Sequence, residues 1–116
     1  MDFDYIIDTC KKYNITNYKI NSDMTIDVYD NVSFYFCYLD EIPLMFNKID
    51  GWLDLSHNNF KNLIGTPKEI KLNIYCYENP LESLDGFNLP FCKLKCDDKQ
   101  KLIRKQKLNK FLDILK

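Results

Sequence analysis

The apolar positions of this chain follow the same pattern three times, in segments that begin at Val32, Leu53 and Ile74. The interval from the first start to the second equals the interval from the second to the third, so the pattern has a fixed period of twenty-one. Each segment has two apolar residues separated by one residue, then a turn position, and then two more apolar residues. Regular spacing of this kind predicts a stack of similar units, because a unit of that length cannot bury its apolar side alone.

The turn position is occupied by Cys37, Asn58 and Asn79. The shared pattern, L-x-L-x-x-[N/C]-x-L-x-x-[L/I], is the consensus of the leucine-rich repeat, whose length is about 20–29 residues. The two apolar residues of L-x-L would point into the core from a short strand, and the residue between them would face outward. A degraded fourth unit begins at Leu94, one residue short of the period. We therefore expect an α+β fold, a short solenoid of three to four repeats with a parallel β-face.

The remaining positions of each unit have a structural interpretation as well. A buried asparagine in the turn can satisfy backbone groups that would otherwise lack partners. The later apolar pair, such as Phe60 and Leu63, would close the core from the opposite side. Gly65 and Gly86 stand where the chain turns back. Such a position often requires a positive φ.

Both ends of such a stack need a cap. Residues 2–13 have a helical apolar stripe of Phe3, Ile6, Ile7 and Cys10. A hairpin of residues 18–20 and 25–29 follows, because the alternation of Ile26, Asp27 and Val28 is typical of a half-buried strand. We expect residues 1–30 to form the N-terminal cap, with the helix packed under the hairpin, and residues 31–96 to form the repeats.

At the other end, residues 98–115 are predicted to form a helix with Asp97 as its N-cap. Its apolar residues recur at i, i+3, i+4 and i+7, which is the spacing of one helix face. They are Leu108, Phe111, Leu112 and Leu115. We expect this face to close the solenoid, so that residues 97–116 form a basic amphipathic capping helix.

Two segments resemble those of a known family. Residues 18–28, YKINSDMTIDV, match a hairpin pattern Y-x-I-x-x-D-x-x-I-D-V. Residues 74–86, IYCYENPLESLDG, match a repeat F-x-C-x-x-N-x-L-x-S-L-x-G-x-P as far as its glycine. The family comprises small leucine-rich-repeat-like proteins encoded mostly by bacteriophages and prophages. Met24 departs from it, because a turn glycine is common there, and the first repeat lacks the glycine of the other two. The resemblance implies a binding role. A more specific hypothesis is that the protein is a phage-encoded inhibitor of a host defence protein.

Composition limits the choice of function. The chain has 116 residues, of which 46% are hydrophobic and 15% are aromatic. We therefore expect a single folded domain over residues 1–116. The net charge is −1. The sequence has neither a membrane-spanning apolar run nor a basic, apolar N-terminal signal.

The number of cysteines indicates a reducing compartment. There are five of them, and an odd number without a secretion signal favours reduced thiols. We therefore expect a cytoplasmic protein, in the host cell if the gene is of phage origin.

The outward positions of the expected β-face are the candidate partner-binding site, because a tryptophan flanked by tyrosines is typical of protein-binding hot spots. The candidate residues are Tyr35, Trp52, Asp54, Ser56, His57, Tyr75, Tyr77 and Glu78.

No motif indicates catalysis, a cofactor or a metal. His57 is the single histidine and belongs to no metal-binding pattern, so a surface role is the better interpretation. Cys92 and Cys96 are spaced more widely than the usual zinc pair, and we expect buried, inert thiols instead. The chain is predicted not to be an enzyme.

Two other functions stay open. Residues 97–116 carry seven basic side chains against three aspartates, a net +4, so residues 1–96 carry −5. A nucleic-acid-associated accessory protein would bind through the basic helix. A self-associating structural protein is the other possibility. A membrane-surface helix is less favoured, because the apolar face is needed to close the solenoid. The basic residues concerned are Lys99, Lys101, Arg104, Lys105 and Lys107.

Overall fold

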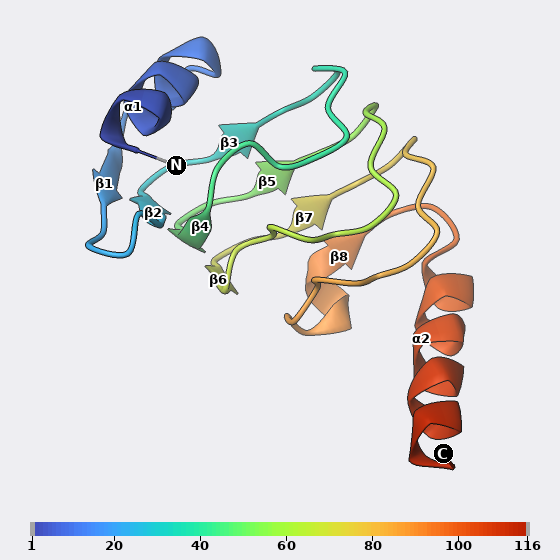
Figure 1. The fold of residues 1–116 in the computed structure, drawn as a ribbon. Helices are drawn as coiled ribbons and strands as arrows, with labels where there is room; N and C mark the ends of the chain where they lie inside the picture. Colours follow the sequence, from blue (N-terminus) through green and yellow to red (C-terminus); the bar gives the residue numbers. More distant parts are fainter. Residues whose placement is uncertain (1, 116) are drawn as a thin grey trace.

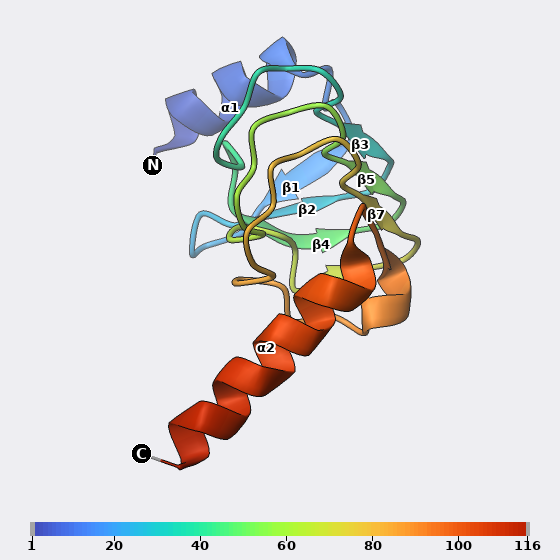
Figure 2. The ribbon, with the colours of Figure 1, turned by 90° about the vertical axis from the view of Figure 1, so that its right-hand side faces the viewer.

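The computed structural model describes residues 2–115, which form an α+β fold with one helix at each end and two four-stranded sheets between them (Figure 1). After the N-terminal helix and hairpin, the chain passes from one sheet to the other and back, and successive passes lie beside one another (Figures 1 and 2). We call each pass a level, and the levels together the stack. A short 3₁₀ helix, η1 (Phe91–Lys93), precedes the last strand.

The first sheet is entirely parallel and contains the strands that the sequence pattern predicts. Its strands, in spatial order, are β3 (Val32–Ser33), β5 (Leu53–Asp54), β7 (Ile74–Tyr75) and β8 (Leu94–Lys95). Leu53 pairs with both Val32 and Ile74, so the first residues of successive segments lie side by side. Ile74 pairs with Leu94, which is one residue short of the same offset. The spacing of the sequence pattern therefore equals the spacing between neighbouring strands, including the shortened last interval.

The second sheet contains the predicted hairpin and two strands that the sequence did not indicate. Its strands, in spatial order, are β1 (Tyr18–Ile20), β2 (Ile26–Val28), β4 (Phe46–Ile49) and β6 (Glu69–Ile70). β1 and β2 are antiparallel, whereas β4 and β6 extend the sheet in parallel from β2. In β4 the two end residues are buried and the two middle residues are half-buried. That arrangement lacks the period-two alternation by which strands are recognised in a sequence.

Polar side chains also join the strands of this second sheet. The Asp27 carboxylate accepts hydrogen bonds from Asn47 Nδ2 at 2.8 Å and from Asn21 Nδ2 at 3.1 Å. These two bonds hold the pKa of Asp27 below its usual value. A side chain just after β1 and side chains of β2 and β4 are thus linked across the sheet, as well as the backbones.

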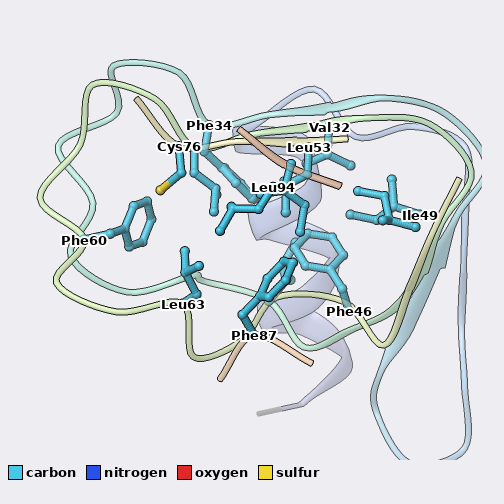
Figure 3. Close-up of a cluster of buried hydrophobic side chains, with 14 of the residues drawn as sticks. Val32, Phe34, Phe46, Ile49, Leu53, Phe60, Leu63, Cys76, Phe87 and Leu94 are labelled. Atoms are coloured by element: carbon cyan, nitrogen blue, oxygen red, sulfur yellow. The ribbon is translucent and has the colours of Figure 1, made fainter. Parts of the chain in front are cut away.

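The core lies between the strands of the first sheet and the loops that return on the opposite side (Figure 3). Leu53 and Leu55 are fully buried from the strand side, and Phe60 and Leu63 are buried from the loop side, as predicted. Figure 3 shows Phe60 and Leu63 facing the strand residues across the core. Removing such a side chain would cost about 2–5 kcal/mol, because the space is enclosed on every side.

The asparagines at the turn position form hydrogen bonds with backbone groups, as the sequence suggests. Asn58 Oδ1 accepts hydrogen bonds from the backbone N–H groups of Cys37 and Leu39, and Asn58 Nδ2 donates to three carbonyls, those of Phe34, Leu55 and Ser56. One level further along, Asn79 Nδ2 donates to the Leu55 and Tyr77 carbonyls. Each amide therefore links two successive passes of the chain.

The glycine prediction is confirmed by the backbone conformation. Gly65 has a φ of +96° and Gly86 a φ of +89°. A Cβ on Gly86 would overlap the backbone of Ile64, so the neighbouring pass leaves no space for a side chain. Met24, at the position where the resembling family has a turn glycine, also adopts a positive φ of 67°.

The N-terminal helix, α1 (Phe3–Lys12), covers the first end of the stack. The Asp2 side chain caps it by accepting a hydrogen bond from Tyr5 N at 2.8 Å. Ile6 and Cys10 are completely buried beneath it, as the predicted stripe requires. Just after the helix, the Tyr13 ring meets the Phe34 ring edge-on at 4.9 Å. Phe3 and Ile7 are exposed, so the inclusion of these two residues in the buried stripe was wrong.

The C-terminal helix, α2 (Lys99–Ile114), differs from the prediction in two respects. Asp98, rather than Asp97, is at the N-cap position, and it caps nothing with its side chain. The Asp97 carboxylate instead accepts a hydrogen bond from Glu78 N at 2.8 Å. The predicted capping stripe from Leu108 to Leu115 is exposed, while Leu102 and Ile103 are buried. Only the first turns of α2 therefore close the stack, and the rest of the helix extends away from it (Figures 1 and 2).

Candidate functional site

The outward side of the first sheet carries one residue from each of its strands. Because side chains alternate along a strand, the residue next to each buried apolar residue faces away from the core. Across the sheet these residues are Ser33, Asp54, Tyr75 and Lys95. Ser33 is exposed and the other three are half-buried, so this row forms the middle of an open face.

Beyond the strands, the chain leaves each level through one residue with a left-handed backbone. The φ of this residue lies between 52° and 59° at all four levels, at Phe36, His57, Glu78 and Asp98. None of them is glycine, and such a conformation costs an L-residue about 1–2 kcal/mol. Backbone hydrogen bonds hold it in place, since Phe36 N donates to the Ser56 carbonyl and His57 N donates to the Tyr77 carbonyl. All four side chains are exposed at this edge of the face.

Four rings gather at the first two levels of this edge, and we call them the aromatic cluster: Tyr35, Phe36, Tyr38 and His57. The His57 ring lies 5.2 Å from the Tyr35 ring and 5.8 Å from the Phe36 ring. Phe36 also contacts Tyr38, with the ring centroids 5.5 Å apart. Despite these contacts, Tyr35, Phe36 and Tyr38 are 52%, 53% and 79% exposed. The rings pack against one another and leave a large apolar surface in contact with solvent.

Two members of the cluster, Phe36 and Tyr38, were not among the residues predicted from the sequence. The signal was present in the aromatic run Phe34-Tyr35-Phe36-Cys37-Tyr38. Alternation along a strand places Phe36 on the same inward side as Phe34. The left-handed backbone at Phe36 and again at Tyr38 redirects both side chains outward. Backbone conformation of this kind has no simple signature in the sequence when the residue is not glycine.

The other predicted residues are placed less uniformly. Trp52 and Tyr75 are half-buried on the face, and Tyr77 is exposed two levels from Tyr35 in the same column. Ser56 is only 5% exposed, and its hydroxyl accepts a hydrogen bond from Tyr77 N at 3.1 Å. Asp54 in turn accepts from Ser56 N at 2.9 Å. Ser56 and Asp54 thus stabilise the turn, and the surface available to a partner comes from the aromatic residues.

The opposite end of the same edge is acidic. Glu78 and Asp98 occupy the left-handed positions of the last two levels, and Asp97 lies beside them. All three side chains are exposed. This edge therefore changes along its length, from the aromatic cluster after β3 and β5 to Tyr77 and the carboxylates after β7 and β8.

The cysteines and the histidine do not combine into a metal site. Within residues 2–115, no group of three His, Cys, Asp or Glu side chains is placed to hold a metal ion. Burial in the core raises the pKa of the Cys76 thiol to about 12. A thiol that resists ionisation is a poor nucleophile and a poor metal ligand. Cys96 is buried as predicted, but Cys92 is exposed at η1, so the expectation of a buried thiol was wrong there.

One pocket lies away from this face. Its volume is about 520 Å³, and it is formed by two loops on the return side of the chain. Its lining combines apolar Ile42, Met45 and Ile64 with charged residues that include Glu41 and Lys61. None of the partner-binding residues predicted from the sequence lines it.

The alternative basic face is on α2. Lys101, Arg104 and Lys107 are exposed there, whereas Lys99 is half-buried. The Lys105 ammonium donates a hydrogen bond to the Glu82 carbonyl at 2.7 Å and links the helix to the body, by which we mean the two sheets and the loops between them. Fewer cations are thus free to contact phosphates than the sequence count suggests.

Within the described residues, neither helix is long and apolar enough to cross a lipid bilayer. Comparison with protein-family models, with curated proteins and with solved structures finds no match to this chain. Function therefore has to be inferred from the geometry of the chain itself.

Proposed function

We propose that the chain is a short leucine-rich-repeat solenoid that binds a partner protein through its parallel β-face. Three observations support this assignment of the fold. The parallel ladder pairs equivalent positions of successive segments, the asparagines recur at the turn, and a left-handed residue recurs after each strand. Repeated units that share a core and expose one continuous face are what define such solenoids.

The single observation that carries the binding role is the aromatic cluster. Rings with this exposure lose contact with water when a partner covers them, and aromatic side chains dominate the energy of many protein interfaces. Three of the four rings stand on a fixed left-handed backbone, at Phe36, Tyr38 and His57. Little backbone freedom at these positions would therefore be lost on binding. We place the centre of the binding surface at this cluster, with Trp52 and Tyr77 further along the face.

The partner would be a protein with an apolar pocket for the rings and basic residues beside it. The carboxylates of Glu78, Asp97 and Asp98 continue the same edge. Complementary charge on the partner would fix its orientation. The resemblance to phage proteins makes a bacterial host protein, one acting in defence, the first partner to test. In this proposal the chain acts by binding its partner and catalyses no reaction.

The left-handed backbone offers a sharp test. Glycine tolerates a positive φ better than any other residue, so Phe36→Gly/Tyr38→Gly removes two exposed rings without straining the fold. Asn14→Gly is a matched control, because Asn14 also has a positive φ (58°) and is exposed, but it lies at the end of α1. Each protein would be immobilised and used for affinity capture from bacterial lysate, and the captured protein would be identified by mass spectrometry.

The affinity of the identified partner would then be measured for all three proteins. We expect the double variant to bind about a thousandfold more weakly, since each hot-spot residue contributes about 2 kcal/mol or more and about 1.4 kcal/mol corresponds to a factor of ten. The control should bind as the wild type does. Equal capture by the double variant would contradict the proposal. Retention of nucleic acid that is lost in a Lys101→Gln/Arg104→Gln variant would instead support the nucleic-acid function.

A further inference from the structure

Four exposed apolar side chains of the C-terminal region lie on one side of α2. Leu108, Phe111, Leu112 and Leu115 are between 47% and 67% exposed. We call these four residues the outer stripe. Their spacing would suit a helix that buries this side, yet no other part of residues 2–115 covers it. The stripe therefore needs an explanation outside the packing of this chain.

Helix geometry shows why the body cannot cover it. Each residue of an α-helix advances by about 100° around the axis, so the centre of the outer stripe lies about 180° from the centre of Leu102 and Ile103. Those two residues are the buried ones, and they hold α2 against the body. Only the near end of the stripe, at Leu108, borders a hollow that it shares with Leu81 of the body. The rest of the stripe points away, and the fold itself prevents it from joining the core.

The charged side chains of α2 are distributed unevenly around the helix. Lys101 and Arg104 lie on the same side of α2, one or two turns earlier, and Lys107 lies at the edge of the stripe. All three side chains are exposed. The single carboxylate of α2, that of Asp113, lines a small pocket together with Ser83 and so lies on the body side. Among the described residues of the helix, the outward side is thus apolar and cationic, with no acidic residue.

The shape of the molecule leaves this side open to a flat surface. Figure 2 views the molecule from the end at which α2 lies and shows the helix passing in front of the last strands and continuing beyond the body. Beyond Leu108 the helix therefore projects past the body and a plane can approach it, whereas Lys101, Arg104 and Leu108 line a hollow that also includes Leu81 and Glu82. Residues 1–96 carry −5, so an anionic surface would be attracted at this end and repelled elsewhere.

We propose that α2 docks this protein on an anionic lipid bilayer. The sequence argued against a membrane-surface helix because its apolar face was expected to close the solenoid. That face is exposed instead, so the reason no longer applies. The outer stripe would enter the boundary between headgroups and acyl chains, and the three cations beside it would contact the lipid phosphates and carboxylates. Interfacial helices usually have one strongly apolar side, whereas α2 has apolar residues on both sides. Leu102 and Ile103 pack on the body, so only the second half of the helix, which carries the outer stripe, would lie in that interface. The stripe covers only two turns, so binding requires both its apolar area and the adjacent charge.

This occupant fits better than a second copy of the chain. Two copies joined through the outer stripe would bring together two segments that each carry +4. They would also share only four side chains each, whereas a stable protein interface takes about 20–30 residues on each side. A bilayer needs no matching shape and supplies the opposite charge.

The test is co-sedimentation of the full chain with lipid vesicles. One set would contain phosphatidylcholine alone, and the other equal parts of phosphatidylcholine and phosphatidylserine, each at low and at high salt. We expect binding to the phosphatidylserine vesicles, weakening with salt as surface charge is screened. Phe111→Ser/Leu112→Ser should reduce that binding about tenfold or more, because two apolar side chains no longer enter the bilayer.

A matched control replaces two exposed apolar residues of the body, in Ile64→Ser/Leu72→Ser. It should bind vesicles as the wild type does, and thermal unfolding of both variants should match the wild type because all four positions are exposed. Absence of sedimentation with phosphatidylserine vesicles would overturn the proposal. So would equal binding to both vesicle types, or equal losses in both variants. A dimer in sedimentation velocity that dissociates only in the α2 variant, without vesicle binding, would assign the stripe to a second copy instead.

Discussion

The two terminal helices have similar sequence patterns and different roles. Both show apolar residues at helical spacing, and both are expected from the sequence to cap the stack. In α1 the inner residues Ile6 and Cys10 are completely buried, and Asp2 closes the first turn. In α2 only Leu102 and Ile103 are buried, and the helix begins from a left-handed Asp98 without a side-chain cap. One helix therefore belongs to the core, and most of the other is available for an interaction.

This contrast shows that apolar spacing identifies a face but not its direction. The direction of α2 is decided by its first turns, where Leu102 and Ile103 meet the last level of the stack. Any apolar stripe half a turn away must then face outward. Three comparisons between the two helices test this view, in order of decreasing expected effect.

The largest difference should be in the free energy of unfolding after truncation of an apolar side chain. Ile6→Ala removes a completely buried side chain beneath α1 and should destabilise the protein by about 2–5 kcal/mol. Leu112→Ala, in the outer stripe, should change stability by less than about 0.5 kcal/mol. Urea denaturation followed by circular dichroism measures both. A loss of several kcal/mol in the Leu112 variant would mean that the stripe is packed against the body after all.

A smaller difference is expected at the two N-caps. Asp2→Ala removes the hydrogen bond to Tyr5 N and should cost about 1 kcal/mol, the usual value of a side-chain cap. Asp98→Gly removes no cap and relieves a positive φ of 52°. Its stability should be unchanged or slightly higher, because glycine adopts such a conformation without strain. The same denaturation experiment decides this comparison, and equal destabilisation by the two substitutions would contradict the difference in capping.

The smallest effect concerns local opening at the two ends. Burial raises the pKa of the Cys10 thiol beneath α1 and that of the Cys96 thiol just before α2. Labelling with a maleimide should be about threefold faster at Cys96, because the lightly packed end opens more often. The measurement uses two variants, each retaining one of these cysteines with the other four replaced by serine or alanine. Faster labelling of Cys10 would show that α1 is the less stable end.

Several features of the fold follow from the sequence because they are local or periodic. The spacing of Leu53 and Ile74 predicts the parallel ladder, and the recurrence of Asn58 and Asn79 predicts amides that satisfy backbone groups at the turn. The hairpin at β1 and β2 and the bounds of both helices agree with prediction to within a residue or two. In each of these cases the alternation or the helical spacing lies within one short segment.

The second sheet and the aromatic cluster were harder to predict for identifiable reasons. β4 lacks alternation and β6 has only two residues, so they become strands only when the neighbouring level is present to pair with them. Phe36 and Tyr38 are turned outward by a backbone conformation that glycine normally signals. The residues predicted from the sequence share an edge with the cluster, but its two most exposed rings were not among them.

The sequence by itself determined the period of the chain, the apolar residues of the core and the residues that turn each level, because these depend on contacts between residues at fixed spacing. Only the tertiary structure decided which rings are exposed, which polar side chains support turns, and which way α2 faces. Those outcomes depend on where neighbouring levels meet. A helix that packs through Leu102 and Ile103 has to present Leu108 and Phe111 to the outside, whatever the hydrophobicity of those residues.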